Sequence, residues 1–213
     1  MTLGLKRFTF QAFSSYCEIQ IYDESRINAK KLTQQLAAEI VRIEKKYSLI
    51  KRNNFLLEIN QSAGNKLGIK LDTETRNLFD IAKLSFEQSL GASDVTAVKL
   101  NSIWRDHLPK HPDKDELDQL GPVIGFEKLG WRGSRLYLPP EMQIDFGSIL
   151  KEYATDAAAQ LAKRLNVRHG LVNLGGDFAV IGPQPDEKPW TIGVANPEEK
   201  NSLLATIEVL EGG

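Results

Sequence analysis

Apolar residues along this chain follow two spacings, and each spacing predicts a different kind of element. Apolar and polar positions alternate over residues 7–22, which predicts one long half-buried strand with an irregular middle at Ser14–Ser15. The segment 51–71 is mixed and rich in asparagine and glycine, so it is expected to form loops and short turns. Apolar spacings of three and four predict amphipathic helices over residues 28–48, 72–90 and 148–165.

Shorter patterns fill the remainder of the chain. A polar turn at residue 92 leads into a short helix ending near Trp104, and a charged, proline-rich excursion with a short helix at 113–120 follows. No internal repeat or linker composition interrupts the chain, so the pattern predicts a single domain over residues 1–213, of α/β (α+β) class, with helices packed on mostly antiparallel sheet. Further strands are expected at residues 127–131, 134–138, 143–145, 170–174, 178–181, 190–194 and 204–210.

Composition narrows the classes of protein that this chain can belong to. With 27 basic and 28 acidic residues the formal net charge is -1, which lacks the basic field that non-specific nucleic-acid binding needs. The single cysteine, Cys17, excludes an internal disulfide framework and a cysteine-cluster metal site, and it fits a reducing compartment. On this strand Cys17 is expected to be buried packing. Nucleic acid is therefore not an expected partner.

The N-terminal residues and the hydropathy pattern bear on location. Residues 1–15 lack the apolar run of a secretory signal, and no stretch approaches the roughly 18 apolar residues of a membrane span. The expectation is a cytoplasmic protein with no membrane segment. A periplasmic location stays open if a signal or lipid anchor was removed.

The polar residues around the start of the third predicted helix are the first candidates for chemistry. Asp145 and Ser148 precede the first turn, and Lys151 lies inside it. A cation there interacts unfavourably with the helix dipole by about 0.3–1 kcal/mol, which favours an anion nearby. The unpaired backbone groups of such a turn can also bind phosphate or a cation coordinated by the backbone. The alternative is that Asp145 or Ser148 caps the helix and Lys151 is solvated.

Two further segments have both a structural and a functional interpretation. Asn173 and Asp177 bracket Gly175–Gly176, which is most simply a hairpin turn, although missing side chains would also let a ligand approach the backbone. Residues 92–96, Ala-Ser-Asp-Val-Thr, taken alone are an Asx turn at a helix start. The three histidines have no metal-ligand spacing, and the chain has no Ser/His/Asp arrangement.

The order of these segments resembles that of a known family. The succession EKKYSLI, EIN, LDTET, GASDVT, IDFGSILKEYATD, LVNLGGD and PWTIGVANP resembles the ApbE family of FAD:protein FMN transferases, from about Phe8 to Pro197. The resemblance implies a T-fold-like domain that binds FAD. With Mg2+ it would transfer the FMN half of FAD to a threonine or serine of a target protein and release AMP.

The resemblance also implies roles for individual residues. The backbone oxygen of Ser148 would bind the metal ion, and no residue is identified as catalytic. The residues at FAD-contacting positions are Phe13, Ala92, Ser93, Asp94, Asp145, Lys151, Asn173, Gly175, Gly176 and Asp177.

This sequence departs from the family pattern in ways that keep other functions open. Phe13, Ile50, Leu150 and Glu152 replace a methionine, a common aromatic residue, an alanine and a glycine of the family. Family members continue beyond LEGG into a segment with further metal ligands, so we expect a C-terminally incomplete domain with apolar surface and a strand edge exposed. The alternatives are a non-catalytic flavin or adenine-nucleotide binder and an FAD pyrophosphatase.

Overall fold

The computed structural model describes residues 3–107, 110–199 and 201–213, and its contacts divide the chain into two compact units. Unit 1 comprises Met1–Glu44 and Lys151–Gly213, and unit 2 comprises Lys45–Leu150. Each unit contains its own sheet and its own buried core. The single-domain organisation stays a prediction.

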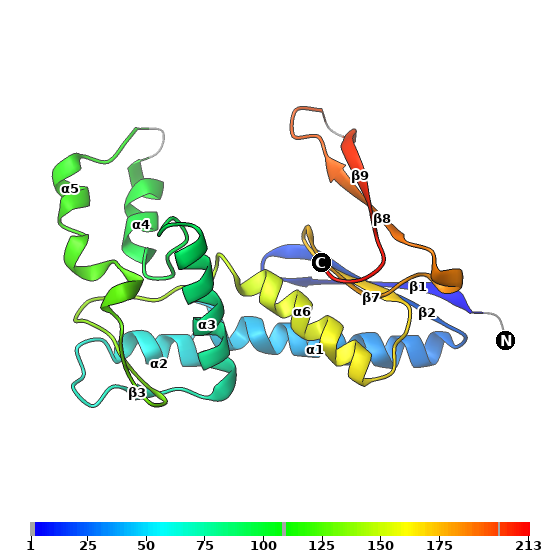
Figure 1. Ribbon diagram of the computed structural model, residues 1–213, viewed down its shortest axis with the longest axis horizontal. Helices are drawn as coiled ribbons and strands as arrows, with labels where there is room; N and C mark the ends of the chain where they lie inside the picture. The colour runs from blue at the N-terminus through cyan, green and yellow to red at the C-terminus, as the bar shows by residue number, and fades with distance from the viewer. Residues whose placement is uncertain (1–2, 108–109, 200) are drawn as a thin grey trace. The chain divides into compact units, whose positions relative to one another are not determined.

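Unit 1 is built on a four-stranded antiparallel sheet (Figure 1). Its strands are β1 (Gly4–Ala12), β2 (Ser15–Asp23), β6 (Gly170–Leu174) and β7 (Asp177–Gly182), in the order β1-β2-β6-β7. The prediction of one strand over 7–22 was wrong, because the chain reverses at Phe13 and Ser14, whose φ angles are 51° and 55°. Phenylalanine is uncommon at positive φ, so its identity did not indicate a turn.

Two of the three long predicted helices belong to this unit. The helices α1 (Arg26–Tyr47) and α6 (Leu150–Arg164) confirm the predictions at 28–48 and 148–165. Figure 1 shows both alongside the sheet. Burial raises the pKa of Cys17 on β2, the charge of Glu44 on α1 also raises it, and the charge of Lys151 on α6 lowers it. Cys17 is fully buried, as expected. Helix α1 continues past Glu44 into unit 2.

A second small cluster covers the opposite side of the sheet. Trp190 is buried with Leu171 and Val180, which lie opposite each other on β6 and β7. Its indole Nε1 donates a hydrogen bond to the carbonyl of Gly182 at 3.0 Å. Trp190 begins the hairpin of β8 (Trp190–Ala195) and β9 (Leu203–Val209), which confirms the predicted strands there. Four apolar residues in and after β9 are exposed, namely Leu203, Leu204, Ile207 and Leu210.

Unit 2 is mainly helical, with a small three-stranded antiparallel sheet in the order β3-β5-β4. Its elements confirm the predicted helix at 72–90, the helix near Trp104, the helix at 113–120 and the hairpin at 127–138. They are α2 (Phe55–Gln61), β3 (Ile69–Lys70), α3 (Thr73–Gln88), α4 (Val98–His107), α5 (Lys114–Asp118), η1 (Gly121–Val123), η2 (Phe126–Lys128), β4 (Gly130–Arg132) and β5 (Arg135–Tyr137).

Helix α2 corrects the prediction of loops and turns over residues 51–71. It begins at an N-cap, Asn54, whose side chain accepts a hydrogen bond from the Leu57 amide, and it buries Leu56 and Ile59. Seven residues make barely two turns, which is too short for a helical period to be read from the sequence.

The strand predicted at residues 143–145 was also wrong. The backbone of Ile144 pairs with a side chain, since its N–H donates to Asn60 Oδ1 at 2.7 Å and its carbonyl accepts from Asn60 Nδ2 at 3.0 Å. The Asp145 N–H donates to the Val95 carbonyl at 2.8 Å. The backbone hydrogen bonds that a strand would form with a neighbour are therefore made to a helix side chain and a loop.

Phe146 anchors this segment in the core of unit 2. It is fully buried, and its ring makes edge contacts with Tyr47 at 5.6 Å and with Phe79 at 5.0 Å between centroids. The Tyr47 hydroxyl hydrogen-bonds the buried Thr75 hydroxyl at 2.8 Å. Among the described residues, no helix is long and apolar enough to cross a membrane.

Replacing Phe146 by alanine should lower the free energy of unfolding by about 3–5 kcal/mol, because it removes a fully buried ring and leaves a cavity. The control Ile50→Ala removes a side chain that is 87% exposed, and it should change stability by less than about 0.5 kcal/mol. Urea unfolding of both variants measures the difference. Equal losses in the two variants would contradict the packing described for Phe146.

Candidate functional site

Five of the predicted site residues line one cavity in unit 2. The cavity has a volume of about 210 Å³. The segments 92–94 and 145–148 are some fifty residues apart in the sequence, and the structure brings them together. Their motifs alone do not indicate this proximity. The lining residues are Ala92, Ser93, Asp94, Val95, Ala97, Val98, Asn101, Asp145 and Ser148.

Asp94 uses its carboxylate to hold the wall of this cavity. Its Oδ1 accepts hydrogen bonds from the Thr96 amide at 2.8 Å and the Thr96 hydroxyl at 2.7 Å, and its Oδ2 accepts one from the Phe126 amide at 3.2 Å. Thr96 is 1% exposed and accepts a hydrogen bond from the Gly125 amide at 2.8 Å. The Asx turn expected for residues 92–96 is confirmed. Thr96 was missed, although its position two residues after Asp94 is typical of such a turn.

Asp145 has a free acceptor in the same cavity. Its Oδ1 accepts a hydrogen bond from the Gly147 amide at 3.0 Å, and Oδ2 has no hydrogen-bond partner among the described residues. Burial raises the pKa of the Asp145 carboxyl, and the hydrogen bond from Gly147 acts in the opposite direction. Among the carboxylates lining this cavity, Asp145 is the one with an oxygen that no described residue hydrogen-bonds.

The Asn173–Asp177 corner in unit 1 is a hairpin turn, as the simpler interpretation expected. Gly175 and Gly176 have φ angles of 66° and 110°, and Asn173 Oδ1 accepts a hydrogen bond from the Gly176 amide at 2.9 Å. A Cβ on Gly175 would lie 2.6 Å from the Cβ of Ser15, whereas one on Gly176 would meet no atom within 4 Å. Gly175 is therefore required by its contact with Ser15, next to the β1–β2 turn that carries Phe13.

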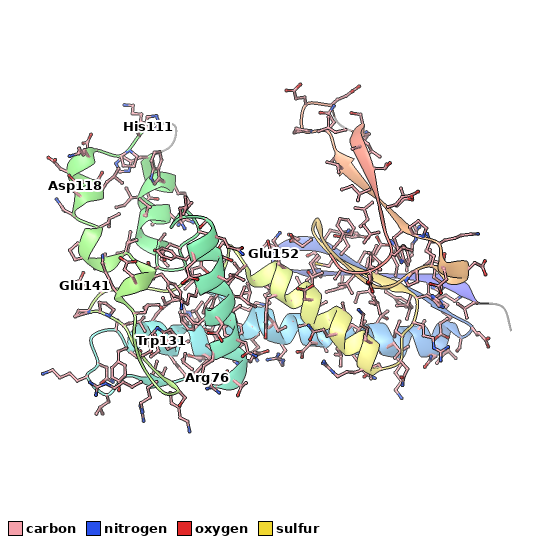
Figure 2. All side chains as sticks on the ribbon, viewed as in Figure 1. Arg76, His111, Asp118, Trp131, Glu141 and Glu152 are labelled. Atoms are coloured by element: carbon pink, nitrogen blue, oxygen red, sulfur yellow. The ribbon has the colours of Figure 1, made fainter. Side chains whose placement is uncertain are left out.

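Lys151 is paired at the start of α6. Its Nζ lies 2.8 Å from Asp177 Oδ2, an oxygen that is buried and has no other partner in the described part of the chain. The hydrogen bond to Asp177 raises the pKa of Lys151, and burial opposes this shift. The anion expected near a cation in the first helical turn is thus Asp177, while 34% of the Lys151 side chain stays exposed to solvent. Glu152 lies in the same turn and is labelled in Figure 2.

The predicted residues therefore form two sets, each described within its own unit. The unit-2 set comprises Ala92, Ser93, Asp94, Asp145 and Ser148, and the unit-1 set comprises Phe13, Lys151, Asn173, Gly175, Gly176 and Asp177. Within residues 3–107, 110–199 and 201–213, no group of three or more histidine, cysteine, aspartate or glutamate side chains is placed to hold a metal ion.

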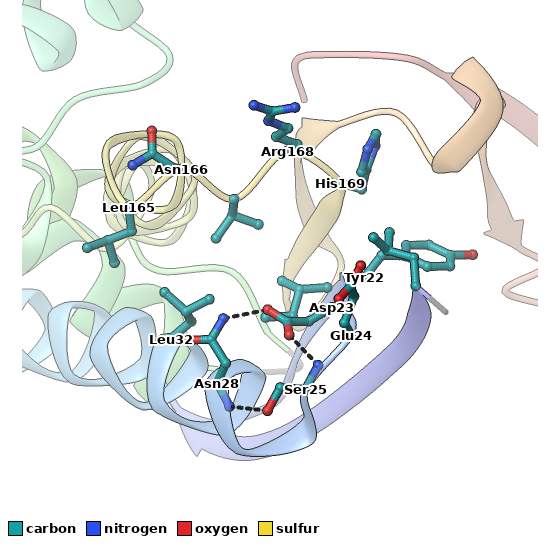
Figure 3. Close-up of a pocket in the computed structure, with 13 residues that line it drawn as sticks. Tyr22, Asp23, Glu24, Ser25, Asn28, Leu32, Leu165, Asn166, Arg168 and His169 are labelled. Carbon is teal, nitrogen blue, oxygen red and sulfur yellow. Dashed lines mark hydrogen bonds between the residues drawn. The ribbon is translucent and has the colours of Figure 1, made fainter. Parts of the chain in front are cut away.

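A larger cavity in unit 1, of about 690 Å³, contains none of these residues (Figure 3). It lies where Leu32 of α1, Leu165 after α6 and the end of β2 meet. Three of its polar residues are bonded together, since Asp23 accepts hydrogen bonds from the Ser25 amide and the Asn28 side chain, each at 2.6 Å. We assign it no role.

Comparison with known proteins identifies a family and its members. Residues 13–212 match the ApbE family. The FAD:protein FMN transferase of Haemophilus influenzae is 23% identical over 190 residues, covering 84% of this chain and 55% of that protein. The enzyme of the same name from Vibrio cholerae is 24% identical over 187 residues, covering 85% of this chain and 56% of that protein. The chain spans about half the length of these curated relatives.

Solved structures show the same fold. The ApbE protein of Thermotoga maritima superposes with a TM-score of 0.88 at 25% identity, over 98% of this chain and 69% of that one. Pseudomonas stutzeri flavinyl transferase ApbE gives a TM-score of 0.82 at 22% identity, over 98% of this chain and 69% of that one. These superpositions confirm the predicted class of mixed helix and antiparallel sheet.

The raised pKa of Asp145 predicts a pH-dependent effect of Asp145→Asn. The Asp145 carboxyl holds its proton more tightly in the folded state than in the unfolded chain. Its contribution to stability is therefore fully present below about pH 4 and is lost as pH rises through the folded-state pKa. Asp145→Asn avoids this loss. Its free energy of unfolding should exceed that of the unsubstituted chain at pH 7, and the excess should vanish toward pH 3.

Urea unfolding across this pH range provides the measurement, with Asp106→Asn as the matched control because Asp106 is exposed on α4. A D145N variant less stable than the unsubstituted chain at pH 7 would show that the Asp145 charge is not disfavoured by burial.

Proposed function

The chain belongs to the ApbE family, and from that membership we propose that it binds FAD and acts in the transfer of FMN to a serine or threonine of a target protein, with release of AMP. The observation that carries this proposal is the meeting of residues 92–94 with Asp145 and Ser148 in one cavity. Relatives named FAD:protein FMN transferase support it.

The unit-2 cavity is suited to one portion of FAD. Its volume of about 210 Å³ lies below the ~300–1,000 Å³ typical of sites that enclose a whole ligand. Asp145 Oδ2 is the acceptor for an N–H or O–H of the nucleotide. Asp94 holds the loop that lines the cavity in place, because all its hydrogen bonds are to Thr96 and Phe126.

The unit-1 set is suited to binding an anion and to letting a ligand contact the backbone. Lys151 lies in the first turn of the 15-residue helix α6, where open amides favour phosphate, and its pairing with Asp177 keeps it charged. The space beside Gly176 leaves the backbone open to approach. We propose that Lys151 contacts the pyrophosphate of FAD and that the turn at Phe13 and the Gly175–Gly176 corner contact other parts of it.

The residues present also fit Mg2+ that is shared with a pyrophosphate. Mg2+ takes oxygen ligands and is commonly held by one or two carboxylates together with phosphate oxygens and water. Ser148 lines this cavity, and its backbone carbonyl would hold the ion together with phosphate oxygens and water. When bound, Mg2+ neutralises charge on the pyrophosphate.

The proposed reaction joins the hydroxyl oxygen of the target residue to the phosphorus of the FMN half. The bond from that phosphorus to the bridging oxygen breaks, the bridging oxygen leaves with AMP, and the hydroxyl proton is released. Lys151 stabilises negative charge on the phosphate oxygens. None of the described residues is assigned as a base for the hydroxyl proton.

Two other functions are distinguished by their products. Glu152 adds an exposed negative charge to the first turn of α6, where the family has glycine, and this favours a binder that does not transfer FMN. Such a binder would hold FAD without releasing AMP. A pyrophosphatase would release AMP and FMN without a target protein.

FAD titration followed by flavin fluorescence should show saturable binding to the 213-residue chain. Asp145→Asn and Lys151→Met should each weaken binding at least about tenfold, since each removes one charged contact worth roughly 1.5–3 kcal/mol. Asp106→Asn should bind as the unsubstituted chain does.

Transfer is tested with FAD, Mg2+ and a protein that carries a flavinylation motif. A fluorescent band on a denaturing gel, with AMP formed only when the target protein is present, is the expected result. FAD binding without AMP would replace the transferase by the binder, and AMP and FMN formed without a target protein would replace it by the pyrophosphatase. Absence of FAD binding would refute all three.

A further inference from the structure

A second cavity in unit 2 is lined by residues that the proposed function does not use. Its volume is about 370 Å³, within the ~300–1,000 Å³ range of ligand sites. We call it the aromatic cavity. It is lined by Phe79, Asp80, Lys83, Phe126, Glu127, Leu129 and Trp131.

The walls of the aromatic cavity are rigid aromatic rings. Phe79 and Phe126 are 2% and 7% exposed, and Phe126 stacks on Phe86 with centroids 5.6 Å apart. Trp131 is 42% exposed, and its ring meets the Phe79 ring edge-on at 5.3 Å. Figure 2 shows Trp131 beside α3. A large indole is thus held against a buried ring while much of its surface stays open to a ligand.

The position of Trp131 is set by the sheet. It lies on β4 directly opposite Leu136 of β5, a residue that is fully buried. Strand pairing fixes the backbone, and the contact with Phe79 limits the rotation of the indole. The exposed part of the indole is therefore pre-organised, which lowers the entropic cost of binding.

The charged residues around this indole are mainly acidic. Asp80 and Glu127 form no ion pair with any residue that the structure describes, while Lys83 has a partner, Glu87, at 3.7 Å one helical turn away. Gly125, at φ 131°, leaves room for the Glu127 carboxylate, because a side chain there would strike it. The aromatic cavity thus joins a partly exposed indole to two exposed carboxylates that form no ion pair with a described residue, with Lys83 on the same lining.

We propose that the aromatic cavity binds an arginine side chain of a partner protein. A guanidinium group stacks on an indole face, and its five N–H donors can serve two carboxylates at once. An apolar ligand would make no use of the exposed Asp80 and Glu127, and an anion would be repelled by them. Free arginine would bring its own carboxylate to this acidic rim, whereas an arginine within a polypeptide does not.

The test titrates a blocked peptide, acetyl-Gly-Arg-Gly-amide, into the isotopically labelled 213-residue chain and follows its three indole N–H signals by NMR. Trp131→Phe identifies the signal of Trp131. The Trp131 signal should shift saturably while those of Trp104 and Trp190 stay in place. The last two signals also report that the fold is intact.

Matched variants and peptides separate charge from shape. Glu127→Gln and Asp80→Asn should each weaken binding of the arginine peptide by up to about fivefold, since an exposed charge pair contributes at most roughly 1 kcal/mol. Asp106→Asn should have no effect. A peptide with neutral citrulline in place of arginine should bind much more weakly.

Three results would overturn this proposal. Equal binding of the citrulline and arginine peptides would show that charge plays no part, and unchanged binding in both acidic variants would exclude Asp80 and Glu127. Free arginine binding as tightly as the blocked peptide would point to a small-molecule ligand. FAD binding is measured on the same samples, so failure here is distinct from failure of the flavin proposal.

Discussion

The position of Asp145 results from three contacts that hold residues 144–146 in place. The Asn60 side chain pairs with both backbone groups of Ile144, the Asp145 amide donates to Val95, and Phe146 is buried between Tyr47 and Phe79. Leaving these backbone groups unpaired in a buried setting would cost about 1–3 kcal/mol each. Because the segment is tied to α2 on one side and to the loop at Val95 on the other, Asp145 must line the same cavity as Asp94.

The acidic residues of the two sets serve different purposes, which their hydrogen bonds reveal. Asp94 is bonded through both oxygens and organises the loop that reaches Phe126, while Asp177 is matched to Lys151. Asp145 is the exception, because it has a raised pKa and an oxygen that no described residue binds. A protein keeps a partly desolvated, incompletely bonded carboxylate at a cost in stability, and ligand binding is a common reason for doing so.

The sequence predicts the long elements of this fold well because each shows several periods of its pattern. Helices α1, α3 and α6 are long enough for that, whereas α2 has seven residues and its Asn54 cap resembles a loop residue. The turn at Phe13 lacks glycine and asparagine, so the two strands on either side of it resemble one. The segment at Ile144 has the composition of a strand but bonds to a side chain, which no local pattern encodes.

The sequence proposes residues for the candidate site but not their contacts. The order of motifs pointed to residues 92–94, Asp145 and Asp177, while spacing along the chain gave no distances between them. The pairing of Lys151 with Asp177 and the hydrogen bond from the Gly125 amide to Thr96 are seen only in the structure. Each joins residues that are well separated in the sequence, so no local pattern predicts it.

Hydrogen–deuterium exchange of the chain with and without FAD tests directly whether FAD binds at the unit-2 cavity. We expect slower exchange of backbone amides at residues 92–97 and 145–151, and unchanged exchange at residues 126–131 of the aromatic cavity. Slowing confined to residues outside 92–97 and 145–151, or no slowing at saturating FAD, would contradict the assignment of the unit-2 cavity to the flavin nucleotide.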